Sequence, residues 1–215
     1  MRIAYVVDVH DRFESVAHAL EGLGDIDLLV VGGDITTFGT AEKAERAIEL
    51  WRPLAPRVLA VAGNMDSPEI DERLVDLGVS IDGRGVTIGD VGVGGVSAAP
   101  KSPLHTPYEL SDAELERRAR AALDAIRDAR VRIFCPHAPP HDTACDRLRS
   151  GEHVGSVVLR DLVEREQPDV LLCGHIHESR GVDELGRTRL ANPGPVASGH
   201  YALVEVGDEA SVSIH

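Results

Sequence analysis

Histidine, aspartate and asparagine side chains recur in five short motifs spread along the chain. The motifs are Asp8-Val9-His10, Gly33-Asp34, Gly63-Asn64, His137 and Gly174-His175-Ile176-His177. In an extended segment, residues two apart point the same way. The two polar residues of the first motif can therefore face one point, and so can the two histidines of the last. Imidazole and carboxylate groups are ligands of divalent transition metals, so these residue types indicate metal chemistry.

Each motif directly follows a short apolar segment that is typical of a buried strand. These segments are residues 2–7, 28–31, 57–61, 131–135 and 169–173. Helical spacing of apolar residues occurs at 14–23, 40–54, 68–77, 111–129 and 155–166. Strands that alternate with helices predict an α/β domain with a largely parallel sheet, whose strand carboxyl ends form the ligand-binding edge. We therefore expect the five motifs to meet at one edge.

Other parts of the chain are rich in glycine and predict hairpins. Residues 79–96 and 181–215 alternate short apolar runs with turn residues, the latter around 185–187 and 206–208. Residues 97–109 and 136–153 are expected to be long loops. We see no linker, repeat or low-complexity stretch, which predicts a single domain over residues 1–215.

Charge and hydropathy exclude several classes of protein. The 215 residues carry a formal net charge of −14, and an acidic surface repels a polyanion, so polymeric nucleic acid is not an expected partner. The apolar runs are far shorter than the ~20 residues of a membrane span, and the N-terminus does not resemble a signal peptide. Three cysteines without CxxC spacing are typical of reduced thiols. We expect a cytoplasmic protein with no membrane partner, and a homo-oligomer stays open.

The candidate metal ligands are four histidines, two aspartates and one asparagine, namely Asp8, His10, Asp34, Asn64, His137, His175 and His177. They are too many for one tetrahedral zinc. They suit two divalent ions that share one carboxylate, with manganese as our first expectation and nickel, iron, zinc or cobalt as alternatives. Such a pair keeps a local positive charge that attracts a small phosphate ester even in an acidic protein. It also clamps both oxygens of an in-line displacement.

The ordered set DxH, GD, GN, H and GHxH resembles the calcineurin-like metallophosphoesterases. The resemblance implies a four-layer αββα sandwich, with two mixed β-sheets flanked by helices and a dinuclear metal site at the strand carboxyl ends. It implies Asp8, His10 and His177 on the first metal, Asn64, His137 and His175 on the second, and Asp34 bridging them. It also implies a metal-bridging hydroxide as the nucleophile.

Further stretches are similar to a compact, cap-free prokaryotic branch of this family, namely Pro139-Pro140, residues 175–181 and Asn192-Pro193-Gly194-Pro195. One position departs from the family pattern. The family often has GNHD or GNHE, with the histidine as proposed general acid, whereas here Met65 follows Asn64. Methionine cannot donate a proton, and general acid catalysis contributes roughly 10²–10⁴-fold. We therefore expect a phosphodiesterase for small phosphodiesters or nucleotides, with weak monoesterase activity.

Three more residues are candidates for the catalytic machinery, and each has a structural alternative. His141 could reach the leaving group, or it could be a solvated histidine. Asp66 could orient a water or a ligand histidine, or it could cap the helix that begins at Pro68. Arg180 could hold a phosphate oxygen, or it could form a surface salt bridge. Residues 192–194 are first of all predicted to form a turn, and the resemblance alone implies that this turn lies near the site.

A second function also stays open, because some relatives use this fold as a metal-binding scaffold for protein partners, with little or no catalysis. The complete ligand set favours the enzyme, and the missing acid mildly favours the scaffold. Among the remaining residues, we expect Tyr5 and Trp51 to anchor the core and Cys135 and Cys173 to be buried in strands. The charged run at 114–120 is expected to be a solvated helix face.

Overall fold

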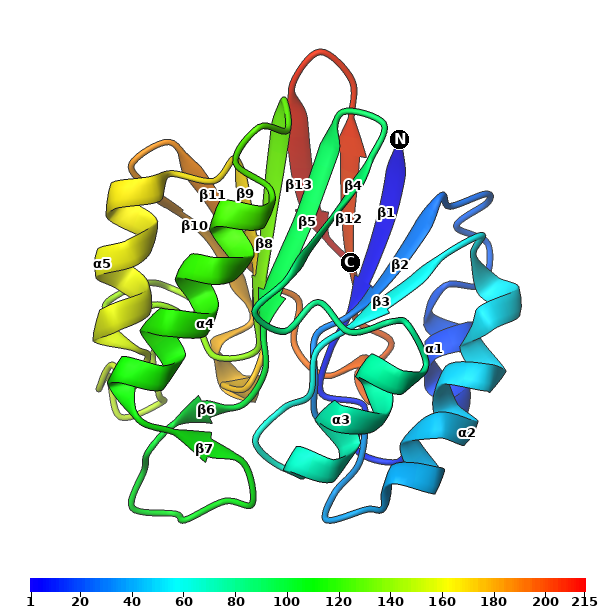
Figure 1. Cartoon of the computed structure of the whole chain (residues 1–215), viewed down its shortest axis with the longest axis horizontal. Helices are drawn as coiled ribbons and strands as arrows, with labels where there is room; N and C mark the ends of the chain where they lie inside the picture. The colour runs from blue at the N-terminus through cyan, green and yellow to red at the C-terminus, as the bar shows by residue number, and fades with distance from the viewer.

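Two large β-sheets form the centre of the computed structural model, which describes residues 1–215 (Figure 1). The first has the order β13-β12-β1-β2-β3, with β1 (Arg2–Val6), β2 (Leu28–Val31), β3 (Val58–Ala60), β12 (Ala202–Val206) and β13 (Ala210–Ile214). The second has the order β10-β11-β9-β8-β5-β4, with β4 (Gly85–Ile88), β5 (Val91–Val96), β8 (Val131–Pro136), β9 (Val170–Leu172), β10 (Gly181–Leu185) and β11 (Thr188–Asn192).

Both sheets are mixed, and their parallel parts carry the motifs. β1, β2 and β3 pair in parallel, and so do β5 with β8, β8 with β9, and β9 with β11. The glycine-rich segments form antiparallel hairpins, β4–β5, β10–β11 and β12–β13, as their turns predict. Residues 97–109 were expected to be only a loop. Instead, β6 (Ala99–Pro100) lies within this segment and pairs in parallel with β7 (Glu109–Leu110), which begins at its end.

Helices cover the outer face of each sheet (Figure 1). α1 (Glu14–Ala19), α2 (Ala41–Trp51) and α3 (Pro68–Asp76) lie beside the first sheet, and α4 (Asp112–Ala125) and α5 (Val157–Glu166) beside the second. Alternation along β1 shows the layers, because Val6 belongs to the core under the helices while Ile3 belongs to the core between the sheets. A third core lies between the second sheet and its helices, around Phe134. The architecture is the αββα sandwich that the resemblance implies.

Several helices are shorter than their apolar spacing predicts. α1 ends at Ala19 rather than near residue 23, and α4 ends at Ala125 rather than near 129. Apolar spacing continues through hydrogen-bonded turns that follow each helix, such as Leu23 N–H to Leu20 O, so the pattern alone runs past the true end. None of the helices combines the length and the apolar character of a membrane span.

The expected core residues are confirmed, but the charged face on α4 is not wholly solvated. Tyr5 and Trp51 are fully buried, and so are the three cysteines, which are all free. Arg118, within the charged run, turns inward and pairs with the buried carboxylate of Asp82 at 2.6 Å. A solvated face is therefore the wrong description of this position, because a long arginine side chain can reach a buried acid from the edge of a helix.

Candidate metal centre

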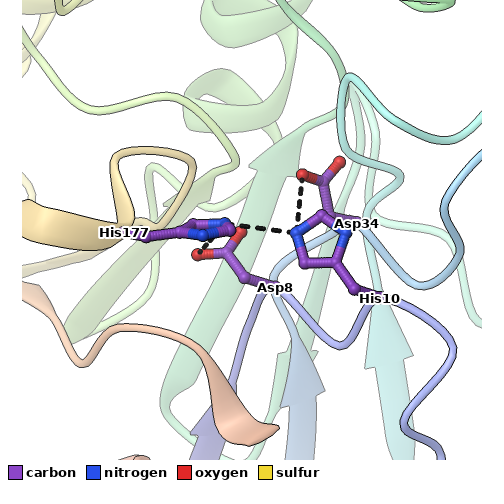
Figure 2. A group of neighbouring side chains, drawn as sticks. All are labelled: Asp8, His10, Asp34 and His177. Carbon is purple, nitrogen blue, oxygen red and sulfur yellow. Dashed lines mark hydrogen bonds and ion pairs between the residues drawn. The ribbon is translucent and has the colours of Figure 1, made fainter. Parts of the chain in front are cut away.

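Asp8, His10, Asp34 and His177 converge beyond the carboxyl ends of β1 and β2, as Figure 2 shows. Each residue offers one ligand atom, and these atoms all lie within 4.8 Å of one another. His10 Nε2 lies 3.1 Å from His177 Nε2 and 3.6 Å from Asp34 Oδ2. His177 Nε2 lies 3.6 Å from Asp8 Oδ2. We call these four residues the first group.

Asn64, His137 and His175 form an adjoining set, which we call the second group. Asn64 Oδ1 lies 2.7 Å from His175 Nδ1 and 3.0 Å from His137 Nε2. Asp34 Oδ1 lies 3.6 Å from His137 Nε2, while the other oxygen of the same carboxylate faces His10. Asp34 therefore stands between the two groups, and the structure brings together all seven residues that the sequence indicated.

Left-handed backbone turns the side chains off their strands. Asp8, His10, Asp34 and His175 have φ values of 54°, 48°, 48° and 68°. Such conformations cost non-glycine residues roughly 1–2 kcal/mol each and persist where the surroundings fix them. Backbone bonds fix two of them, because Asp8 N–H donates to Gly33 O and His10 N–H donates to Asp34 O. Gly63 is also required, since a Cβ there would lie 2.1 Å from Asp34 Oδ1.

The donor set fits a cation because a lone pair of His137 converges with those of Asn64 and Asp8. His137 Nδ1 donates to Gly32 O at 2.8 Å, which leaves Nε2 as an acceptor that faces the acceptor Asn64 Oδ1. Burial lowers the pKa of His137 to about 3 and that of His175 to about 4, so both imidazoles are neutral at pH 7. Asp8 Oδ2 is buried and has no hydrogen-bond partner.

The carboxylates of the first group point to the same conclusion. Burial raises the pKa of Asp34 well above its usual range, and the neighbouring Asp8 and Asp66 raise it further. Two acids crowded in a buried site disfavour ionisation, and a divalent ion reverses that preference. Both electrostatics and the neutral histidines therefore suit a divalent metal.

Asp66 holds backbone, and it neither contacts a ligand histidine nor caps the helix that begins at Pro68. Its buried carboxylate accepts hydrogen bonds of 2.8–3.0 Å from the N–H groups of Ile35, Thr36 and Gly63 and from the Thr36 hydroxyl. It bonds no histidine, and Ser67 occupies the N-cap position of α3. Burial raises the pKa of Asp66 to about 6, although these bonds lower it. Asp66 thereby ties the loop that carries Asp34 to the turn that carries Asn64.

His141 and Arg180 lie outside both groups. His141 Nδ1 lies 3.6 Å from Asp146 Oδ2, and no hydrogen bond or ion pair joins this histidine to the seven residues. Arg180 is exposed and forms no ion pair, so the salt-bridge alternative is wrong. Its side chain lies beside Gly194.

Two residues outside the predicted ligand set help to position the site. Thr37 Oγ1 lies 3.0 Å from His10 Nδ1, and its place three residues after Asp34 is the one signal in the sequence. Asn192 is buried and donates from Nδ2 to Ile176 O at 3.0 Å, between the two histidines of the last motif. The turn at 192–194 therefore lies next to the site, as the resemblance implies.

Comparisons with known proteins agree with this geometry. A family model described as calcineurin-like phosphoesterase matches residues 1–179. The uncharacterized protein MJ1162 of Methanocaldococcus jannaschii is 32% identical over 200 residues, which cover 91% of this chain and 88% of that protein.

Solved structures of low identity share the fold. TT1561 of Thermus thermophilus has a TM-score of 0.75 at 17% identity, with 99% of this chain and 97% of that chain covered. The phosphopantetheinyl hydrolase of Mycobacterium tuberculosis has a TM-score of 0.65 at 17% identity, with 91% and 90% covered. The family match, together with the Asp and His cluster, indicates a phosphoester hydrolase that binds divalent metal. This chain belongs to the calcineurin-like phosphoesterase family.

Proposed function

We propose that this protein is a dinuclear metal-dependent phosphodiesterase that hydrolyses small phosphodiesters or nucleotides. One observation carries the proposal, namely that Asp34 directs one carboxylate oxygen toward His10 and the other toward His137. A carboxylate that faces two separate sets of ligands is the arrangement that a two-metal site requires. Divalent ions, when bound, supply Lewis acidity and lower the pKa of water, which provides a nucleophile at neutral pH.

The chain's own residues would hold the ions and keep them in register. The first ion would be held by Asp8, His10 and His177, the second by Asn64, His137 and His175, and both by Asp34. Hydrogen bonds from the far ring nitrogens fix two of the imidazoles, since His10 Nδ1 contacts Thr37 and His137 Nδ1 donates to Gly32 O. Mixed imidazole, carboxylate and amide ligands support manganese as the metal.

The position after Asn64 supports the choice of substrate. Met65 N–H donates to Asp34 Oδ1 at 2.8 Å, so this residue helps to hold the shared carboxylate, but its side chain has no proton to give. His141 lies next to Asp146. The site therefore favours substrates whose leaving groups depart without a proton from the protein, which supports phosphodiesters over ordinary phosphomonoesters. We also propose a cytoplasmic location, supported by three free, buried cysteines.

Hydrolysis of two chromogenic esters tests the proposal. Metal-stripped protein would be assayed on bis-p-nitrophenyl phosphate and p-nitrophenyl phosphate, with Mn²⁺, Ni²⁺, Zn²⁺, Co²⁺ or Mg²⁺ added back. We expect metal-dependent cleavage of the diester, weak cleavage of the monoester and none by Asp34→Asn. Asp161→Asn, which removes an exposed carboxylate from α5, is the matched control and should retain activity. Absence of cleavage with every metal, although ions bind, would contradict the enzyme and favour the scaffold.

A further inference from the structure

Behind the turn that carries Asn64, two hydroxyl groups bond one buried carboxylate. Asp71 belongs to α3 and is 8% exposed. Ser97 Oγ donates to Asp71 Oδ1 at 2.8 Å, and the Tyr108 hydroxyl donates to Asp71 Oδ2 at 2.8 Å. None of these three residues belongs to either ligand group, so the proposed chemistry does not use them directly.

The same two hydroxyl-bearing residues hold the backbone on either side of the Asn64 turn. Ser97 Oγ accepts from Ala62 N–H at 2.9 Å, and Tyr108 N–H donates to Asn64 O at 3.1 Å. A hydroxyl has a single proton. Because Ser97 gives that proton to Asp71, a lone pair is left for Ala62 N–H. The carboxylate of Asp71 therefore orients the Ser97 hydroxyl that holds Ala62 and anchors the side chain of Tyr108, whose backbone holds Asn64.

Arg118 completes the network from α4. Its Nη1 lies 2.7 Å from the Tyr108 hydroxyl oxygen and 2.6 Å from Asp82 Oδ2. Asp82 in turn accepts from Ser97 N–H at 2.8 Å. Burial raises the pKa of Tyr108, so its hydroxyl keeps the proton that it donates to Asp71. A buried polar network in which each member has a partner is rigid and is suited to fixing a ligand.

We propose that Asp71 is a positioning residue that fixes Asn64 and so sets how tightly the second group holds its divalent ion. The inference rests on the proposed function. Asn64 follows β3 and is held through residues 62 and 64 by this network, whereas the other two members of its group follow β8 and β9. The first group has its own contacts at Thr37 and Gly33. Loss of the Asp71 carboxylate should therefore weaken one ion position and leave the other intact.

Stepwise metal binding to Asp71→Asn tests this inference. Asparagine keeps the size of aspartate but replaces one acceptor oxygen with a donor, so it cannot accept from both hydroxyls in the same way. Mn²⁺ would be titrated into the metal-stripped full chain and followed by calorimetry and by the electron paramagnetic resonance signal of free Mn²⁺. We expect one of the two Kd values to rise roughly tenfold or more while the other stays within about twofold, as for other partners of metal ligands.

Asp169→Asn is the matched control, because it removes a half-buried carboxylate that also holds backbone, with Arg132 N–H donating to it at 2.7 Å, but at the amino end of β9. It should leave both binding steps unchanged. Equal weakening of both steps by Asp71→Asn, or no weakening of either, would overturn the inference. If the wild-type chain binds one ion only, the proposed function fails first, and the inference fails with it.

Two milder variants keep the test decisive if Asp71→Asn does not fold, which thermal unfolding of each metal-stripped variant would show. Ser97→Ala and Tyr108→Phe each remove one hydroxyl and leave the carboxylate. We expect both variants to weaken the same binding step as Asp71→Asn, and Ser97→Ala to weaken it more, because Ala62 N–H loses its partner. Tyr201→Phe removes a hydroxyl from a half-buried tyrosine outside the network and should have no effect. Two unchanged binding steps in both network variants would also contradict the inference.

Discussion

The two ligand groups share Asp34 but differ in their surroundings. The side chain of His137 in the second group is 0% exposed, whereas that of His177 in the first group is 46% exposed. The second group is built into the core, with its histidine tautomer and its asparagine turn fixed by buried hydrogen bonds. The first group has buried carboxylates, but its two histidines reach the surface, where they face each other at 3.1 Å. One half of the centre is thus preorganised by packing, and the other is the side open to solvent and substrate.

The largest loss of activity is expected at Asp34, the residue that both groups share. Asp34→Asn removes the carboxylate charge between the two ion positions. A two-metal clamp contributes several kcal/mol to the transition state, so we expect diester hydrolysis to fall by at least about 10³-fold. Steady-state kinetics on bis-p-nitrophenyl phosphate at saturating Mn²⁺ measure this, and a loss below tenfold would argue against a shared ligand.

The two groups are expected to contribute differently to the unfolding free energy of the metal-free protein. His137→Ala leaves a buried cavity and deprives Gly32 O of its donor, so we expect the metal-free protein to lose about 2–3 kcal/mol of unfolding free energy. His177→Ala, at an exposed position, should cost less than about 0.5 kcal/mol. Both variants should lose activity. Urea unfolding of the metal-free variants gives the two values, and equal losses would remove the distinction between a core half and a surface half.

Activity on monoesters is expected to depend on position 65, which follows Asn64 of the second group. Met65→His places an imidazole next to Asn64, where it can protonate a leaving group. We expect hydrolysis of an alkyl phosphate monoester such as glycerol 2-phosphate, whose alkoxide leaving group needs a proton, to rise by roughly tenfold, the low end of what general acid catalysis contributes when geometry is not optimised. The ratio of kcat/KM for monoester and diester is the measurement. A variant that binds metal normally and shows the wild-type ratio would refute the role of this position.

The net response of stability to pH is the smallest expected difference, because histidines and acids contribute in opposite directions. Burial lowers the pKa of His137 to about 3 and of His175 to about 4, whereas an unfolded histidine takes up a proton near pH 6.5. The pair therefore removes stability from the metal-free protein as the pH falls from about 6.5 toward 4, by about 1.4 kcal/mol per pH unit for each histidine. Asp66 acts in the opposite direction, because its raised pKa of about 6 makes its contribution decline as the pH rises.

Residue-resolved titration avoids this cancellation between histidines and acids. In ¹H–¹⁵N spectra of the metal-free protein, we expect the imidazoles of His137 and His175 to stay neutral at every pH above about 5. The titration of His10 gives the corresponding measurement for the first group. Burial lowers the pKa of His10, and the neighbouring Asp8 raises it. A midpoint near 6.5 for either buried histidine would show that the second group is not the buried half.

Much of this centre could be predicted because it depends on local rules. Each of the five motifs follows a strand, and parallel strands bring their carboxyl ends to one edge, so Asp8, Asp34 and Asn64 could be placed together without knowing the second sheet. The hairpin turns near Gly186 and Gly207 follow from their residues in the same way.

Contacts between segments distant in sequence could not be predicted. Asp66 looked like a helix cap or a partner of histidine, because those roles are decided within a few residues, but its partners lie about 30 residues away, at Ile35 and Thr36. Arg118 looked solvated, because helical spacing does not show a buried carboxylate such as Asp82 across the chain. The missing information is the packing of one loop on another, which no local pattern contains.

The most direct test of a two-metal centre is an anomalous difference map from crystals grown with Mn²⁺. A shared two-metal centre predicts two peaks about 3.5–4 Å apart, one among Asp8, His10 and His177 and one among Asn64, His137 and His175, with Asp34 between them. A single peak at saturating Mn²⁺, or two peaks that Asp34 does not link, would contradict the shared centre on which the proposed function rests.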